Sequence, residues 1–168
     1  MNRLLRLLKH RTFDERDAAR ALGAGGLARI EARVADSEQR HSGEIRVCIE
    51  SGLPLSYLWR NASARERAVA MFGKLRVWDT EHNSGVLIYL LLAERRIEIV
   101  ADRGLNRHVG VEAWQIIMGT MRNAFQAGQF EAGLNQAIDA VDALMLKHFA
   151  IAAGDSNPNE LPNAPVVR

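Results

Sequence analysis

Oxygen-bearing side chains gather in two short segments that lie on either side of a long apolar stretch. Asp79, Glu81 and Asn83 belong to the polar segment DTEHNS, and Asp102 follows the apolar stretch. Carboxylate and amide oxygens are the hard ligands that Ca²⁺ and Mg²⁺ prefer in proteins. These four residues are therefore candidate ligands of a divalent cation, Ca²⁺ or Mg²⁺, provided that the two segments meet in space.

Two further residues in the same segments could take part in a reaction. His82 carries an imidazole, which exchanges a proton near neutral pH and is a candidate general acid or base. Arg103, beside Gly104, could steady a phosphate charge, and backbone N–H groups would help if a helix begins at Leu105. The same residue types also build ordinary turns and solvated loops, because Asp and Asn bond their own backbone and Gly adopts a positive φ. The residues alone leave both interpretations open.

The apolar stretch must double back to bring the two segments together. Residues 86–92 form a continuous apolar run, which is typical of a strand covered on both faces. Residues 97–101 form a second short apolar-rich run, and the AERR sequence between them is too short for a crossover connection. An antiparallel hairpin is therefore predicted, and its open end gathers residues 79–84, residues 102–108 and the entry to an earlier strand at 41–44.

The rest of the chain alternates between strand and helix patterns. Residues 44–50 (EIRVCIE) alternate apolar and polar side chains, as a half-buried strand does. Ser63 and Glu66 form a capping box that begins a crossover helix, so this strand and the next should be parallel with a right-handed connection. Two long amphipathic helices follow Gly104 and are separated near Gly128. The predicted fold is a three-layer α/β/α sandwich around a small mixed sheet, with two long C-terminal helices.

The N-terminal sequence MNRLLRLLKHRTF predicts a leucine-rich helix rather than an export signal. Arg6 interrupts its leucines, so no apolar core of the usual length is present. The Leu4–Leu8 helix could dock on the domain, contact a protein partner or lie on an anionic membrane surface. Thr12 and Glu15 form a further predicted capping box, which would begin a helix that ends at Leu22.

Composition limits the class of protein. The chain has 168 residues, of which 48% are hydrophobic and 25% charged, as in one soluble domain. The formal net charge is only +2, and no basic stripe is interleaved with aromatic residues, so no nucleic-acid partner is expected. Cys48 is the single cysteine, which favours a reducing compartment, and a cytoplasmic location is predicted. The predicted organisation is a helical extension at 1–26, an α/β domain at 27–150 and an extended tail at 151–168.

The sequence NSGVLIYLLLAERRIEIVADRGL, preceded by SGEIRVCIE and followed by a long helical region, resembles the TPM domain family. The resemblance covers roughly residues 27–150 and implies an α/β/α sandwich around a small mixed sheet. Some members of this family are reported as acid phosphatases, and some bind a divalent metal in an acidic cleft. The chain resembles a short cytosolic bacterial branch of the family.

The resemblance carries over to the two polar segments residue by residue. It assigns the approach to the second strand to Asp79, Glu81, His82 and Asn83, and the motif after the third strand to Asp102, Arg103, Gly104 and Leu105. The chain departs from the family pattern in three places: Ser84 and Ala101 each stand where the family often has Gly, and residues 106–108 (NRH) stand where it often has acidic residues. Fewer carboxylates imply weaker metal retention.

Two functions follow as hypotheses. In the first, the chain is a non-catalytic cation- or protein-binding assembly module that uses the polar rim and the N-terminal leucine-rich helix. In the second, it is a weak metal-assisted phosphatase of phosphate monoesters, in which Asp79 and Asp102 hold the cation. There Arg103 would steady the phosphate, and His82 would be the acid or base. The first is favoured because the sequence shows no recognised nucleophile.

Overall fold

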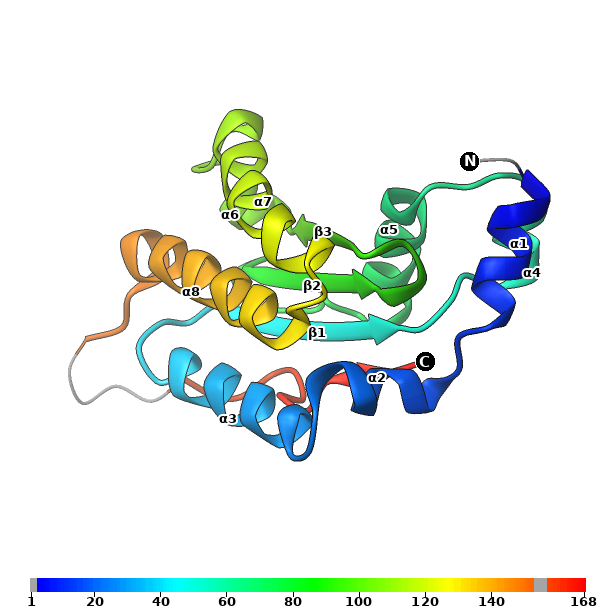
Figure 1. Cartoon of the computed structure of the whole chain (residues 1–168). Coiled ribbons are helices and arrows are strands. Elements are labelled where there is room, and N and C mark those ends of the chain that lie inside the picture. The colour runs from blue at the N-terminus through cyan, green and yellow to red at the C-terminus, as the bar shows by residue number, and fades with distance from the viewer. Residues whose placement is uncertain (1–2, 153–156) are drawn as a thin grey trace.

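A four-stranded mixed sheet forms the centre of the computed structural model, which describes residues 3–152 and 157–168. The strand order is β3-β2-β1-β4, and helices lie on both sides of the sheet (Figure 1). The strands are β1 (Glu44–Glu50), β2 (Gly85–Leu91), β3 (Arg96–Ala101) and β4 (Val166–Val167). This arrangement confirms the predicted α/β sandwich around a small mixed sheet.

The hairpin predicted from the short AERR connection is present. β2 and β3 pair antiparallel, with Val86 opposite Ala101 and Leu91 opposite Arg96. One turn of 3-10 helix, η1 (Leu92–Glu94), makes the connection, and Arg95 follows in the left-handed region at φ 50°. β1 and β2 are parallel, as the crossover helix between them requires.

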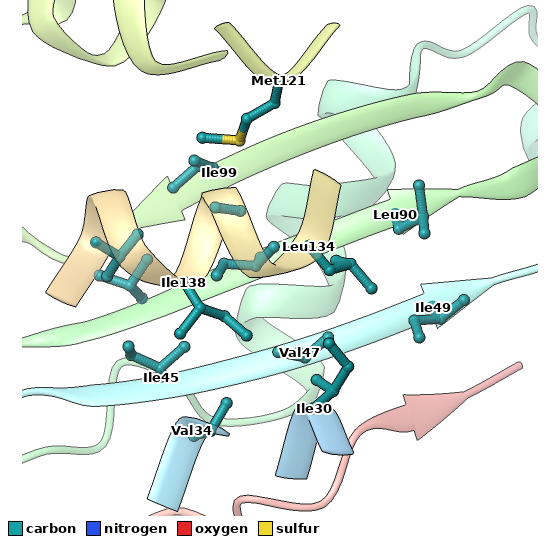
Figure 2. Close-up of a cluster of buried hydrophobic side chains, with 14 of the residues drawn as sticks. Ile30, Val34, Ile45, Val47, Ile49, Leu90, Ile99, Met121, Leu134 and Ile138 are labelled. Atoms are coloured by element: carbon teal, nitrogen blue, oxygen red, sulfur yellow. The ribbon is translucent and has the colours of Figure 1, made fainter. Parts of the chain in front are cut away.

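Eight helices surround the sheet within the described part of the chain. They are α1 (Arg3–Arg11), α2 (Glu15–Leu22), α3 (Gly26–Glu38), α4 (Leu55–Trp59), α5 (Ala64–Lys74), α6 (Arg103–Asn106), α7 (Val111–Gln126) and α8 (Phe130–Phe149). α2, α3, α7 and α8 cover one face, where Ile45, Val47 and Ile49 of β1 pack against Ile30 and Ile138 (Figure 2). α4, α5 and the C-terminal segment pack on the other face, around Cys48, Leu87 and Tyr89.

β1 differs from the half-buried strand that its alternating sequence predicts, because all seven of its residues are buried. Its polar side chains face α5 and the C-terminal segment instead of solvent. Glu50 accepts hydrogen bonds from Arg67 Nε at 2.8 Å and Nη2 at 2.6 Å, and from the Tyr89 hydroxyl at 2.6 Å. Alternation therefore located the strand correctly, and an ion pair at Glu50 together with backbone hydrogen bonds at Glu44 and Arg46 satisfies its polar face.

The C-terminal segment, which was predicted only to be extended, contributes the fourth strand of the sheet. β4 pairs parallel with β1, with Cys48 opposite Val166 and Ile49 opposite Val167. Arg46 in β1 donates to the backbone carbonyls of Pro162 and Ala164. This segment therefore covers the outer edge of β1.

One of the two predicted capping boxes is confirmed, and the other begins at a different residue. Ser63 caps α5 and exchanges hydrogen bonds with Glu66, as predicted. α2 is capped by Asp14, whose side chain accepts from Arg16 N, so the prediction of Thr12 as N-cap was wrong. The Thr12 hydroxyl instead donates to the Lys9 carbonyl at 2.7 Å and closes the end of α1. Across the described residues, every helix is too short or too polar to cross a bilayer.

Candidate functional site

Backbone hydrogen bonds join the two polar segments at one end of the sheet. Gly104 N donates to the Asn83 carbonyl at 2.9 Å, and Asp102 N donates to the Gly85 carbonyl at 2.9 Å. The loop entering β1 lies beside them, because the Ser84 hydroxyl donates to the Ser42 carbonyl at 3.1 Å. The expected meeting of the three loops is therefore present. We call residues 79–84 together with residues 102–104 the polar rim.

The two segments of the rim approach each other so closely at Gly104 that no side chain would fit there. A Cβ on Gly104 would lie 2.4 Å from the Asn83 carbonyl oxygen and 2.6 Å from that of His82. Gly104 is not among the glycines of positive φ, so the turn conformation considered from the sequence is not the reason for it. Close approach of the two backbones is the reason.

Asp102 is the most constrained of the predicted cation ligands. It caps α6, where its Oδ1 accepts from Arg103 N at 2.7 Å. Its Oδ2 is buried and has no hydrogen-bond partner in the described part of the chain. A buried acceptor without a donor costs roughly 1–3 kcal/mol, so this oxygen is suited to a ligand that supplies positive charge or a donor.

Arg103, the predicted phosphate contact, is engaged within the rim. Its Nε donates to Asn83 Oδ1 at 2.8 Å, which joins a predicted catalytic residue to a predicted cation ligand. Asn83 itself has a positive φ of 51°, a conformation that Asn tolerates better than most residues. The rim thus brings Asn83, Asp102 and Arg103 together.

The other predicted site residues are placed more loosely. The side chains of Asp79, Glu81 and His82 are exposed. Within residues 3–152 and 157–168, no three His, Cys, Asp or Glu side chains lie close enough to one another to form a metal-binding group. The structure therefore gathers the predicted residues in one region without closing them into a coordination shell.

Other acidic residues reach the same end of the sheet and were missed from the sequence. Glu160, in the C-terminal segment, accepts a hydrogen bond from Glu81 N at 2.9 Å. Glu44 accepts from Leu161 N at 3.1 Å, and burial raises the pKa of its carboxyl group. The return of the tail brings Glu160 to the rim and Leu161 to Glu44, and no local sequence pattern signals that return.

Glu38 is a second missed carboxyl group near the start of β1. Its Oε1 accepts from Ile45 N at 2.7 Å, while its Oε2 is buried without a partner among the described residues. Burial raises the pKa of Glu38 to about 8. It therefore binds a proton at neutral pH more readily than an exposed glutamate does. Its position in a helix of otherwise surface-like pattern gave no signal of this burial.

Histidines from distant elements stack beside the rim. The rings of His108 and His148 lie 4.7 Å apart between centroids and are nearly parallel, with an interplanar angle of 14°. Phe149 contacts His108 edge-on, with centroids 6.1 Å apart. His108, which the sequence places at this end of the sheet, thus packs against the end of α8.

One known protein family matches most of this chain. The family model for the TPM domain matches residues 16–144. The chain belongs to the TPM domain family. This match confirms the resemblance inferred from the two strands and the motif that follows the third, and it begins earlier than the stretch on which the resemblance was based.

Two solved structures share the fold of this TPM domain. The NMR structure of the BA42 protein from the psychrophilic bacterium Bizionia argentinensis is 26% identical, with a TM-score of 0.72, and the match covers 85% of this chain and 93% of that one. The N-terminal domain of a P. gingivalis protein is 18% identical, with a TM-score of 0.62, and the match covers 78% and 83% of the two chains. No curated protein matches the chain.

Proposed function

We propose that this TPM domain is a non-catalytic binding module whose polar rim takes up one divalent cation, Ca²⁺ or Mg²⁺, with Asp102 as the anchoring ligand. The observation that carries the proposal is the buried Asp102 Oδ2, which has no partner in the described chain. A hard cation prefers such a carboxylate oxygen and would offset the cost of its burial. The resulting affinity should be weak, because the neighbouring carboxylates are exposed and spread apart.

Further oxygens within the rim support the same choice. Asn83 Oδ1 is an amide oxygen of the rim, and Arg103 Nε donates to it at 2.8 Å. Glu160 adds a carboxylate that contacts the backbone of Glu81. Oxygen ligands drawn from several loops are usual in Ca²⁺ sites, which tolerate flexible geometry and bound water.

The same contacts disfavour the phosphatase hypothesis. The phosphatase hypothesis needs Arg103 to meet the substrate phosphate, but its Nε is engaged by Asn83. It also needs His82 to hold a fixed position, and the side chain of His82 is exposed. General acid–base catalysis depends on such positioning, because a displaced group loses much of its effect.

A residue-resolved NMR titration with CaCl₂ and with MgCl₂ tests the proposal. We expect amide shifts confined to residues 79–83 and 102–108. The Asp102→Asn variant should lose them and keep the fold, because Asn is as good a helix N-cap as Asp. Asp36→Asn is the matched control, because Asp36 is exposed on α3 and makes the same change of charge.

Three outcomes would count against the proposal. Cation-induced shifts outside the rim would place the site elsewhere, and unchanged shifts in Asp102→Asn would remove Asp102 as ligand. Turnover of p-nitrophenyl phosphate that Asp102→Asn abolishes would favour the phosphatase instead. The proposal expects cation binding with no such turnover.

A further inference from the structure

The polar side of α1 faces the domain. Arg6 Nε contacts Glu94 Oε1 at 2.7 Å, and its Nη2 donates to the Ala62 carbonyl at 2.7 Å. His10 Nε2 lies 3.0 Å from the same Glu94 oxygen, and its Nδ1 accepts from Leu53 N at 2.9 Å. His10 is only 4% exposed. Charged and polar contacts therefore hold this helix in place.

The leucine-rich side of α1 consequently faces outward, the reverse of an ordinary amphipathic helix on a soluble domain. Leu4, Leu5 and Leu8 are 65%, 59% and 55% exposed. Leu55 and Trp59 of the neighbouring α4 are 52% and 75% exposed. We call these five residues the α1–α4 apolar surface. Large exposed apolar side chains gathered on neighbouring helices mark a surface that something else covers.

A cavity borders the α1–α4 apolar surface at Leu4 and Trp59. Arg3, Leu4 and Leu7 of α1 line a cavity of about 420 Å³ with Leu58 and Trp59 of α4. Figure 1 shows α1 and α4 side by side at one end of the molecule, beyond the ends of β1 and β2. The exposed leucines of α1 and Trp59 of α4 therefore lie at one end of the molecule.

The charge around this surface is positive. Arg3, Lys9 and Arg11 lie on the same helix as the exposed leucines, whereas Arg60, which follows Trp59, is paired with Glu66 at 2.8 Å. Glu94, the acidic group that contacts the docked side of α1, is paired with Arg6 and His10. Leucines and a tryptophan bordered by arginine and lysine are the composition of a helix that lies in the interface of an anionic bilayer.

We propose that the α1–α4 apolar surface binds an anionic lipid bilayer. The leucines and Trp59 enter the boundary between headgroups and acyl chains, and the surrounding basic side chains contact lipid phosphates. A second copy of the chain fits less well, because two such surfaces would bring like charges together. The proposal is independent of cation binding at the rim, which lies at the opposite end of β2.

Vesicle co-sedimentation of the full chain in EDTA tests this surface without any rim cation. Vesicles of phosphatidylcholine with about 30% phosphatidylserine should bind the protein, and pure phosphatidylcholine should bind it far more weakly. Leu5→Gln/Leu8→Gln should lower the partition coefficient at least about tenfold, because two apolar side chains no longer leave water. Ile116→Gln is the matched control, because Ile116 is 69% exposed on α7, away from this surface.

Charge and fluorescence give two further readouts. Lys9→Gln should weaken binding about fivefold at low salt, whereas Lys147→Gln, in the last turn of α8, should not. Tryptophan emission should shift to the blue on binding, and Trp59→Phe should remove most of the shift.

Several results would overturn the proposal. These are equal binding to neutral vesicles, full binding by Leu5→Gln/Leu8→Gln, or no binding to the anionic vesicles. Lipid-free dimerisation that Leu5→Gln/Leu8→Gln abolishes would assign the surface to a second copy. Failure here leaves the NMR titration of the rim unaffected, since that titration contains no lipid.

Discussion

At the scale of single residues, Gly104 allows the two segments of the polar rim to lie in contact. The loop after β3 passes so near the loop before β2 that a side chain at this position would strike two carbonyl oxygens. Asp102 and Arg103 flank this contact directly, and both owe their position beside Asn83 to it. The geometry of the candidate cation site thus depends on a glycine at position 104, because only a residue without a Cβ lets the two loops come this close.

We predict that Gly104→Ala lowers the free energy of unfolding by about 1–3 kcal/mol, because the added methyl forces two backbones apart. It should also shift the NMR signals of Asn83 and Asp102. Gly119→Ala in α7 is the control, because its Cβ would meet nothing within 4 Å and alanine favours a helix. Urea unfolding of both variants checks this, and equal stability of the two would contradict it.

At the scale of elements, the β2–β3 hairpin has two roles. Its open end forms the rim, and its turn carries Glu94, which holds α1. Burial opposes ionisation of Glu94, yet hydrogen bonds from His10 and Arg6 lower its pKa to about 2. Because the folded-state pKa lies below the ordinary value of 4.5, this carboxylate stabilises the docked helix above about 4.5. That contribution is lost as the pH falls toward 2.

We predict that Glu94→Gln loosens α1 while leaving the sheet intact. Charge-assisted hydrogen bonds are each worth roughly 1.5–3 kcal/mol, so amide exchange in Arg3–Arg11 should accelerate at least tenfold. Exchange in β1 and β2 should stay unchanged. Glu15→Gln, exposed at the start of α2, is the control. Unchanged protection of α1 at neutral pH would show that Glu94 does not hold it.

At the scale of the whole molecule, the C-terminal segment packs back against β1 and the polar rim. It pairs with the outer edge of β1, and two of its backbone carbonyls accept hydrogen bonds from Arg46. Its Leu161 belongs to the hydrophobic cluster between the sheet and α5. It also brings Glu160 to the rim. An uncovered strand edge is a site for pairing with other chains, so this cover protects the domain from association.

Removal of residues 161–168 should therefore destabilise the protein and promote association. The deletion uncovers the edge of β1 and leaves the buried Glu44 and Arg46 without the backbone groups that they contact. Light scattering should show concentration-dependent assembly of the shortened chain. Pro158→Ala, which leaves β4 in place, should remain like the parent. A monomeric, equally stable shortened chain would contradict this role.

The sequence by itself determined the local elements and the end of the sheet where the polar segments meet. The run at 86–92, the four-residue connection and the Ser63 capping box each depend on neighbours within a few residues, so periodicity and turn length predict them. Strand direction then follows from connection length, and it places residues 79–84 beside Asp102.

Only the tertiary structure decided what covers each surface. The burial of Glu44, Arg46 and Glu50 depends on a tail more than a hundred residues away and on α5, so their alternating pattern indicated solvent instead. The outward leucines of α1 depend on Glu94, which lies 88 residues from Arg6. Sequence spacing shows which side chains share a face, but contacts between distant segments determine whether that face meets protein or water.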